Sequence, residues 1–293
     1  MIRLAIRVRR EQAELVLAEL LELAPGGVEE VEVDPATIEY AVYGPPGELP
    51  SLPDLRVAAA GALVEVTTSE VADDWAERWR EFHRPLVLGE RLVVRPPWAP
   101  PPASGALDLI IDPGRAFGTG AHATTRLCLE LLLDLERPVV FETTGSASGP
   151  ATSPRVIDLG CGSGVLGIAA ARLGWAPVLG LDFDPLAVAA TLENAGVNGV
   201  GELVRAEPFD LRTSPVPAAP LVLANLLGPL LLIWCSQLAS GMAERPGRVI
   251  ASGLLEREAD PIADTFAGVG LREIDRRLQG EWAAILFSRD DRG

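Results

Sequence analysis

Apolar and polar residues alternate along several short stretches near the N-terminus, and one longer stretch repeats apolar residues at helical spacing. Alternation with a period of two is typical of a half-buried strand, and recurrence at i, i+3 and i+4 is typical of an amphipathic helix. Residues 1–70 are therefore expected to form a small α+β domain of ferredoxin-like character. The pattern predicts a helix over residues 11–23 and strands over residues 4–8, 28–33, 38–43 and 62–67.

Residues 71–103 are expected to connect this domain to the rest of the chain. Trp75, Trp79 and Phe82 recur at helical spacing, which predicts a helix whose apolar face packs between domains. The run of prolines in residues 96–102 fixes φ and removes backbone donors, so it cannot be regular helix or central strand. It predicts a stiff connector ahead of the second domain.

Apolar strand-like runs alternate with Ala- and Leu-rich helical runs from residue 104 to residue 293. This alternation is typical of a parallel sheet covered by helices. Residues 143–153 interrupt it with small polar side chains, which predicts a surface insertion. The expected fold class is α/β, a Rossmann-like domain preceded by the small α+β domain.

Composition narrows the classes of function. The formal net charge of −16 argues against a protein that grips nucleic acid, because binding phosphates requires clustered basic side chains. No run reaches the ~18–20 uncharged apolar residues that span a bilayer, so we expect no membrane partner. Cys128, Cys161 and Cys235 are isolated, which predicts a reducing, cytoplasmic location. His83 and His122 are too few for a His-rich metal site, and no metal is expected.

The strongest local signal is an apolar strand that runs into a glycine-rich turn and then a helix. The strand covers residues 156–159, the glycines are Gly160, Gly162 and Gly164, and the helix follows over residues 165–171. Glycine permits positive φ and lets a ligand lie against the backbone, close to the free amides of a helix N-terminus. The segment predicts a cofactor site.

A carboxylate follows this turn at the spacing typical of ribose recognition. The next strand, residues 178–182, ends in Asp182, about 20 residues after the glycines, where it can accept hydrogen bonds from a ribose diol. Asp184 stands directly before Pro185, so it either caps the next helix or joins the site. Both carboxylates are candidates for binding the cofactor.

Dinucleotides and S-adenosylmethionine both bind to this architecture, and two features favour the sulfonium cofactor. The glycines are spaced Gly-x-Gly-x-Gly, whereas the dinucleotide fingerprint is Gly-x-Gly-x-x-Gly. Asp158, just ahead of the glycines, would repel a phosphate but suits the cationic methionyl end of S-adenosylmethionine, directly or through water. Its alternative role is to cap a helix or a turn.

Two further segments place polar groups at the same edge of the sheet. Residues 112–125 form a dense string of glycine, hydroxyl and imidazole groups that leads into a helix expected from Arg126, which Thr124 or Thr125 could cap. The strand over residues 221–224 delivers Asn225 at its carboxyl end, where doubly wound sheets hold their ligands. We expect Asn225 to lie beside the cofactor.

Taken together, these segments resemble the PrmA family, bacterial methyltransferases of large-subunit ribosomal protein eleven. The likeness covers most of residues 72–290, including residues 75–79 and the closing Glu281-Trp282. The glycine turn is shared with methyltransferases generally, whereas the glycine, threonine and histidine string is highly specific. Four stretches match in order, namely residues 112–125, 156–164, 180–185 and 224–230.

The resemblance implies a class I methyltransferase domain and an N-terminal domain that grips the ribosomal protein. A flexible linker would let the catalytic domain reach several lysine or N-terminal amino groups. Cofactor contacts are implied at Thr125, Gly160, Asp182 and Asn225. We add further candidates that flank these contacts in the matching segments, and they are Phe117, Thr124, Asp158, Gly162, Gly164 and Asp184.

Methyl transfer to an amine requires alignment and a neutral nucleophile, whereas free lysine, with a pKa near ~10.4, is almost wholly protonated at neutral pH. Desolvation would lower that pKa. Asn225 and neighbouring carbonyls are expected to accept hydrogen bonds from the amine and to aim its lone pair. His122 is interpreted as ordering its loop, with proton acceptance as the alternative. We expect a monomer.

Three other interpretations remain open from the sequence. The first is a methyltransferase that acts on another protein or a small molecule, although Asn225-Leu226-Leu227 lacks the Asn-Pro-Pro-Tyr pattern used for amide or base nitrogens. The second is a nicotinamide-dependent dehydrogenase, which the glycine spacing disfavours. The third is a non-catalytic binding module that kept the fold.

Overall fold

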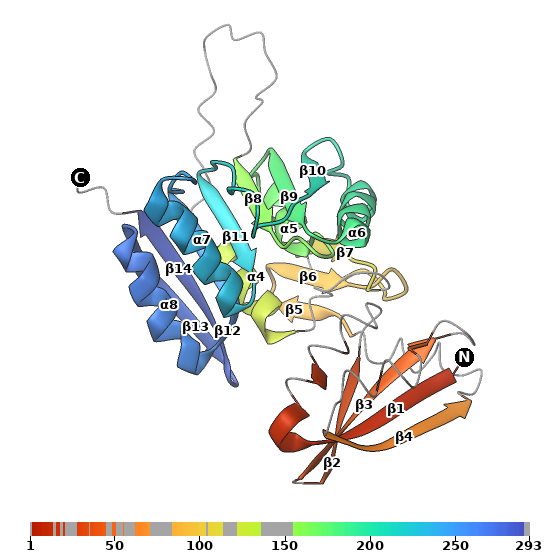
Figure 1. Ribbon diagram of the computed structural model, residues 1–293. Coiled ribbons are helices and arrows are strands. Elements are labelled where there is room, and N and C mark those ends of the chain that lie inside the picture. The colour runs from red at the N-terminus through yellow and green to blue at the C-terminus, as the bar shows by residue number, and fades with distance from the viewer. Residues whose placement is uncertain are drawn as a thin grey trace, which may run out of the picture. The chain divides into compact units, whose positions relative to one another are not determined.

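The structure is a computed structural model in which the chain divides into two compact units, Met1–Phe82 and His83–Gly293, called here the N-terminal and C-terminal units (Figure 1). The predicted helix over residues 72–82 and the predicted insertion over residues 143–153 lie outside the described residues. The domain boundaries expected at residues 70 and 103 stay predictions. The residues that the structure describes are 2–13, 16–17, 20, 28–34, 36–44, 49–50, 55, 62–70, 84–103, 105–113, 122–135 and 155–289.

The N-terminal unit contains a four-stranded antiparallel sheet in the order β2-β3-β1-β4. The four predicted strands are confirmed, each within a few residues of its expected bounds. A short 3-10 helix, Arg10–Gln12, begins where the helix over residues 11–23 was predicted, and much of the rest of that stretch lies outside the described residues. The strands are β1 (Ile2–Arg9), β2 (Glu29–Asp34), β3 (Thr37–Gly44) and β4 (Leu63–Glu70).

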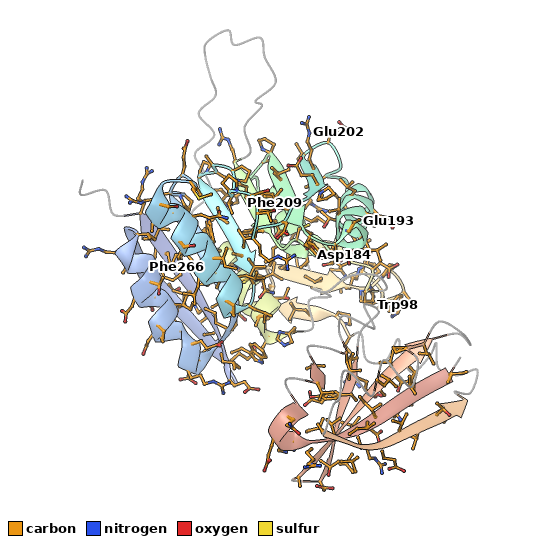
Figure 2. The ribbon with its side chains drawn as sticks, viewed as in Figure 1. Trp98, Asp184, Glu193, Glu202, Phe209 and Phe266 are labelled. Carbon is orange, nitrogen blue, oxygen red and sulfur yellow. The ribbon has the colours of Figure 1, made fainter. Side chains whose placement is uncertain are left out.

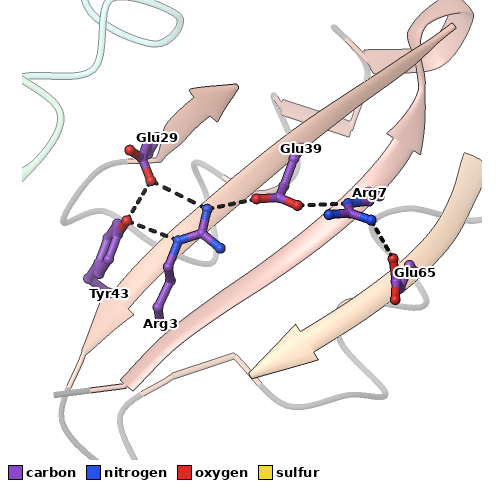
Figure 3. A network of polar contacts seen from close by, with 6 residues as sticks. All are labelled: Arg3, Arg7, Glu29, Glu39, Tyr43 and Glu65. Atoms are coloured by element: carbon purple, nitrogen blue, oxygen red, sulfur yellow. Dashed lines mark hydrogen bonds and ion pairs between the residues drawn. The ribbon is translucent and has the colours of Figure 1, made fainter. Parts of the chain in front are cut away.

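The two faces of this sheet differ because side chains alternate along each strand. Leu4, Ile6 and Val8 of β1 are buried in an apolar cluster. On the other face, Arg3 and Arg7 flank the carboxylate of Glu39, at 2.7 and 2.8 Å (Figure 3). The hydrogen bond from Arg3 contributes most to holding the pKa of Glu39 below its ordinary value. One face therefore forms the core of the unit, and the other carries a paired charge network.

The C-terminal unit is built on a seven-stranded sheet in the order β10-β9-β8-β11-β12-β14-β13. A three-stranded sheet, β5-β6-β7, precedes it in the chain and packs through Leu92 and Leu109 into the same apolar cluster as helix α5. The strands are β5 (Leu86–Leu88), β6 (Leu92–Arg95), β7 (Leu107–Ile110), β8 (Val156–Leu159), β9 (Val178–Asp182), β10 (Val204–Pro208), β11 (Leu221–Asn225), β12 (Arg248–Leu255), β13 (Leu271–Gln279) and β14 (Trp282–Arg289).

Helices cover both faces of the large sheet, as the alternating pattern predicted. The helices are α4 (Ala123–Asp134), α5 (Val165–Arg172), α6 (Pro185–Val197), α7 (Gly228–Ser240) and α8 (Glu256–Gly268). Helices α4 and α5 share one apolar cluster, and α7 and α8, side by side over β11 to β14 in Figure 1, share the other. Phe266 of α8, labelled in Figure 2, stacks on Phe287 of β14 with ring centroids 4.5 Å apart. Among the helices that the structure describes, none is long and apolar enough to cross a membrane.

The strand order reverses between β8 and β11, because the chain moves outward to β9 and β10 and then returns to β11 and β12. In doubly wound sheets, ligands bind in the crevice outside the carboxyl ends of the strands at such a reversal. The strand β14 runs antiparallel between β12 and β13, which departs from the order 3-2-1-4-5-6 of the dinucleotide-binding fold. The topology therefore disfavours the dehydrogenase interpretation and places a site where β8 and β11 end.

Candidate functional site

The glycine-rich turn after β8 uses backbone conformations that favour glycine. Gly160, Gly162 and Gly164 have φ angles of 74°, 52° and 80°. A Cβ at Gly160 would lie 2.4 Å from Cδ2 of Leu226, and one at Gly164 would lie 2.9 Å from Cγ2 of Thr191. The positive φ angles are those that the sequence predicted, and the absence of side chains at Gly160 and Gly164 lets Leu226 and Thr191 approach closely.

Asp182 ends β9 beside this turn. Its Oδ2 accepts the Gly162 N–H at 2.9 Å, and its Oδ1 accepts the Asp184 N–H at 3.0 Å. A carboxylate oxygen has two lone pairs, so each oxygen of this half-buried side chain retains one acceptor position. Asp184 is the N-cap of α6, since its Oδ1 accepts the Leu186 N–H at 2.8 Å and Pro185 occupies the first turn. The predicted capping role of Asp184 is confirmed.

Asp158 is buried below the turn, with 2% of its surface exposed. Its Oδ2 accepts the N–H of Gly167, the third residue of α5, at 2.8 Å. Gly164, the N-cap residue of α5, has no side chain with which to cap, so β8 supplies the cap to the helix. The capping role given as the alternative is therefore present, and the contact of Asp158 with the cofactor stays a prediction.

Burial raises the pKa of Asp158 to about 7, against the lowering effect of the Gly167 hydrogen bond, and the charge of Asp182 raises it further. Because this pKa is higher in the folded chain than in the unfolded chain, the folded protein keeps a proton that the unfolded chain has released. The contribution of Asp158 to stability therefore falls as the pH rises from about 4 to about 7, the window between the two pKa values.

We expect Asp158→Asn, which keeps an oxygen acceptor for the Gly167 N–H, to gain stability relative to the parent protein as the pH rises. One pKa unit corresponds to about 1.4 kcal/mol, so the relative gain between pH ~5.5 and pH ~8 is expected to be about 2 kcal/mol. Calorimetric unfolding of both proteins at the two pH values measures it. The same stability difference at both pH values would contradict the raised pKa.

Asn225 stands at the carboxyl end of β11, on the other side of the strand reversal from the glycine turn. Its Nδ2 donates to Oγ1 of Thr125 at 3.4 Å, so the structure brings these two predicted site residues together. The next residue, Leu226, contacts Gly160 closely, and a Cβ at Gly253 would lie 2.4 Å from the Leu226 carbonyl oxygen. Gly160 therefore allows the segment after β11 to lie against the turn after β8, and Gly253 allows the same segment to lie against β12.

His122 is the N-cap of α4, and the helix begins at Ala123, three residues earlier than predicted. The suggestion that Thr124 or Thr125 caps the helix is therefore wrong, because the Thr124 N–H is donated to Nδ1 of His122 at 3.3 Å. Thr124 and Thr125 lie in the first turn, with 1% and 0% of their surfaces exposed. The predicted helix is confirmed, but a histidine caps it.

The contacts of His122 favour a positional role. Burial lowers its pKa, and its ring meets Trp282 edge to face with centroids 4.7 Å apart. Its Nδ1 lies 2.8 Å from Oγ1 of Thr124 and accepts the Thr124 N–H at 3.3 Å. These contacts fix the ring at the start of α4, which favours loop ordering over the alternative of proton acceptance.

Some predicted site residues lie outside the described residues, and some residues that support the site were not predicted from the sequence. Phe117 belongs to the first group, because residues 114–121 lie outside the described ones. Thr191, Asn194 and Asn198 belong to the second, since their side chains hydrogen-bond to the glycine turn or to the segment before Asp112. Polar residues spaced i, i+3 and i+7 on one face of an otherwise apolar helix were the signal that could have found them.

These groups fit S-adenosylmethionine. Asp182 retains acceptor positions for a ribose diol, and the positive-φ glycines leave the backbone of the turn without side chains. The carboxylates of Asp182 and Asp184 lie beside the turn, which suits a sulfonium cofactor and opposes a pyrophosphate. The site residues would therefore hold this cofactor better than a dinucleotide.

Comparison with known proteins points to one family. The family described as "Ribosomal protein L11 methyltransferase (PrmA)" matches residues 54–290. A ribosomal protein L11 methyltransferase of Syntrophotalea carbinolica is 38% identical over 305 residues, which cover 94% of each chain. One of Pelotomaculum thermopropionicum is 35% identical over 96% of each chain. The crystal structure of a ribosomal protein L11 methylase from Lactobacillus delbrueckii subsp. bulgaricus has a TM-score of 0.57 and 29% identity, and covers 70% of this chain and 98% of that one.

Fold, site and comparisons agree on the class of protein. The C-terminal unit has an α/β methyltransferase fold, preceded by an antiparallel sheet in the N-terminal unit, and its cofactor is S-adenosylmethionine. The chain belongs to the PrmA family. The predicted family, enzyme class and cofactor are thereby confirmed.

Proposed function

We propose that this chain transfers methyl groups from S-adenosylmethionine to ribosomal protein L11, at lysine or N-terminal amino groups. The observation that carries the proposal is the family match over residues 54–290. It includes all the segments that meet where β8 and β11 end, namely those of Thr125, Gly160, Asp182 and Asn225. A chain that had kept only the fold would not need these four residue types together.

Each predicted site residue has a proposed role in holding the cofactor. Asp182 accepts hydrogen bonds from the ribose hydroxyls through its remaining lone pairs. The turn that contains Gly160, Gly162 and Gly164 receives the methionyl end, with Asp158 acting below it through the helix cap or through water. Thr125 borders the cofactor from the start of α4, with Phe117 and Thr124 in the same loop. Asp184 acts through the orientation of α6 and of the Asp182 carboxylate.

The reaction needs a neutral amine held in line with the methyl group. When bound, S-adenosylmethionine would supply an electrophilic methyl group, whose bond to sulfur breaks as the bond to the amine nitrogen forms, with S-adenosylhomocysteine as the leaving group. The carboxamide oxygen of Asn225 accepts a hydrogen bond from the amine and aims its lone pair, which converts the encounter into an oriented reaction. A neutral carboxamide also gives the charged ammonium form no ion-pair partner, so it does not raise the pKa of the amine. The surplus proton leaves to solvent, without an obligatory side-chain base.

The N-terminal unit is proposed to be a ferredoxin-like domain that recognises the ribosomal protein. Its antiparallel order β2-β3-β1-β4 is the order of a βαββαβ unit with β1 and β3 in the centre. Residues 71–103 are proposed to link this domain, residues 1–70, to a methyltransferase domain over residues 104–293. We also propose a cytoplasmic monomer that binds no nucleic acid directly, in keeping with its net charge of −16.

Incubation of the purified chain with S-adenosylmethionine and purified bacterial L11 tests this function. We expect mass increments of whole methyl groups on L11, and peptide mapping is expected to locate them on lysine side chains or the N-terminal amine. Methylation confined to other residue types would contradict the proposed amine chemistry. Binding of the cofactor without methylation of L11 would direct the search to other substrates.

A further inference from the structure

Helix α6 and its C-cap residue, Asn198, present a stripe of buried polar side chains to their neighbours. Thr191, Asn194 and Asn198 are spaced i, i+3 and i+7, and 2%, 4% and 7% of their surfaces are exposed. Thr191 Oγ1 donates to the carbonyl of Gly162 at 3.0 Å. A buried polar group destabilises a fold unless it is hydrogen-bonded, so the partners of this stripe indicate what it holds in place.

Asn198 provides the hydrogen bonds that a neighbouring strand would otherwise provide to the last residue of β7. Its Oδ1 accepts the Ile110 N–H at 2.9 Å, and its Nδ2 donates to the Ile110 carbonyl at 2.7 Å. One carboxamide thus satisfies both backbone groups of the last residue of an edge strand, as a paired strand would. The same Nδ2 donates to the carbonyl of Asn194 at 2.8 Å, which joins this anchor to the preceding turn of α6.

Asn194 connects two segments that are far apart in the sequence. Its Nδ2 donates to the carbonyl of Ser163, inside the glycine turn, at 2.9 Å. Its Oδ1 accepts the N–H of Asp112, the first residue of the string that leads to Thr125, at 3.2 Å. This side chain therefore ties the glycine turn to the start of that string. One carboxamide holds Ser163 and Asp112 at a defined spacing.

The helix that carries Asn194 is itself fixed to the ribose carboxylate. Asp184, the N-cap residue of α6 that is labelled in Figure 2, caps the helix and donates its own N–H to Asp182. The cap at the start of α6 and the side chain of Asn194 thus secure the Asp182 carboxylate, the glycine turn and the Asp112 segment to one rigid element. All three belong to the C-terminal unit.

We propose that Asn194 is a positioning residue of the methyltransferase site, which sets the distance between the glycine turn and the backbone at Asp112. The inference rests on the proposed function, because the glycine turn carries the proposed cofactor contact Gly160. Asn194 acts through this turn. Its loss is expected to weaken cofactor binding, because a binding site needs supporting hydrogen bonds that hold its contact groups in place.

Two variants separate positioning from stability. Asn194→Ala removes both hydrogen bonds, and the isosteric Asn194→Asp keeps the acceptor for Asp112 but removes the donor to Ser163. Gln237→Ala is the matched control, because Gln237 is a carboxamide with 7% of its surface exposed that bonds Leu211, Ser214 and Val216. The measurements are the Kd and KM for S-adenosylmethionine, the kcat on L11 and the Tm.

We expect both Asn194 variants to raise the Kd and KM for S-adenosylmethionine about tenfold or more, with a smaller loss in kcat. Gln237→Ala should lower the Tm comparably and keep both constants within twofold of the parent protein. A folded Asn194→Asp variant with an unchanged Kd and KM would overturn the positioning role, and so would an equal rise in the control. If Asn194→Ala fails to fold, the isosteric variant decides. Failure of the parent protein to bind the cofactor would instead overturn the proposed function.

Discussion

Replacement of Asp182 by alanine is expected to raise the Kd for S-adenosylmethionine by at least ~100-fold. In the proposed complex the carboxylate accepts hydrogen bonds from two ribose hydroxyls, and hydrogen bonds to a charged group contribute about 1.5–3 kcal/mol each. Since about 1.4 kcal/mol corresponds to a factor of ten, losing both weakens binding by two orders of magnitude or more. Isothermal titration of the purified variant with S-adenosylmethionine measures the effect.

The same substitution also removes the acceptor for the Gly162 and Asp184 N–H groups, so its effect on stability must be measured separately. Asp182→Asn retains one acceptor oxygen and is expected to have an intermediate Kd and a Tm closer to that of the parent protein. Asp264→Ala, an exposed charge change on α8, serves as the control and should leave the Kd unchanged. A Kd for Asp182→Ala within threefold of the parent value would refute the ribose assignment.

Substitution of Asn225 is expected to act on kcat more than on cofactor affinity. Asn225→Ala removes the oxygen that aims the amine, and loss of one preorganised hydrogen-bonding group at a reacting centre typically lowers kcat by about 100-fold or more. Asn225→Asp keeps acceptor oxygens but introduces a charge, which favours the protonated amine and raises its pKa. Its pH–rate profile should therefore move to higher pH, whereas that of Asn225→Ala should keep its midpoint.

Initial rates on L11 across a pH series measure both effects, with the Kd for S-adenosylmethionine determined in parallel. The hydrogen bond from Asn225 to Thr125 is long, at 3.4 Å, so its loss is expected to change the Tm little. A kcat for Asn225→Ala within threefold of the parent value would exclude the proposed role in aiming the amine. An unshifted profile for Asn225→Asp would place the carboxamide away from the nucleophile.

Local chemistry explains which parts of the site could be predicted from the sequence. The glycines predict a turn, because few other residues adopt positive φ, and they are Gly160, Gly162 and Gly164. Asp184 is predicted to cap a helix because a proline follows it. The structure confirms both the turn and the cap. Both predictions depend only on residues that are close together in the sequence. They can therefore be made without knowledge of the rest of the fold.

Features that depend on distant partners could not be predicted in the same way. A cap was predicted as the alternative role of Asp158, but its partner was not, because the close approach of Gly167 is what brings α5 to within 2.8 Å of the carboxylate. His122 replaces a threonine as the cap of α4, although hydroxyl and carboxylate side chains are the usual caps. The strands β5 and β6 escaped prediction because they are short and are completed by pairing with each other and with β7. In each case the deciding partner is supplied by tertiary structure.

The most direct measurement is incubation of the purified chain with radiolabelled S-adenosylmethionine and the complete set of bacterial ribosomal proteins, followed by mass spectrometry of every labelled band. With all potential substrates in competition, we expect label on large-subunit protein L11, located on amino groups. Label confined to other ribosomal proteins, or no label despite measurable binding of the cofactor, would contradict the proposal that this chain methylates L11.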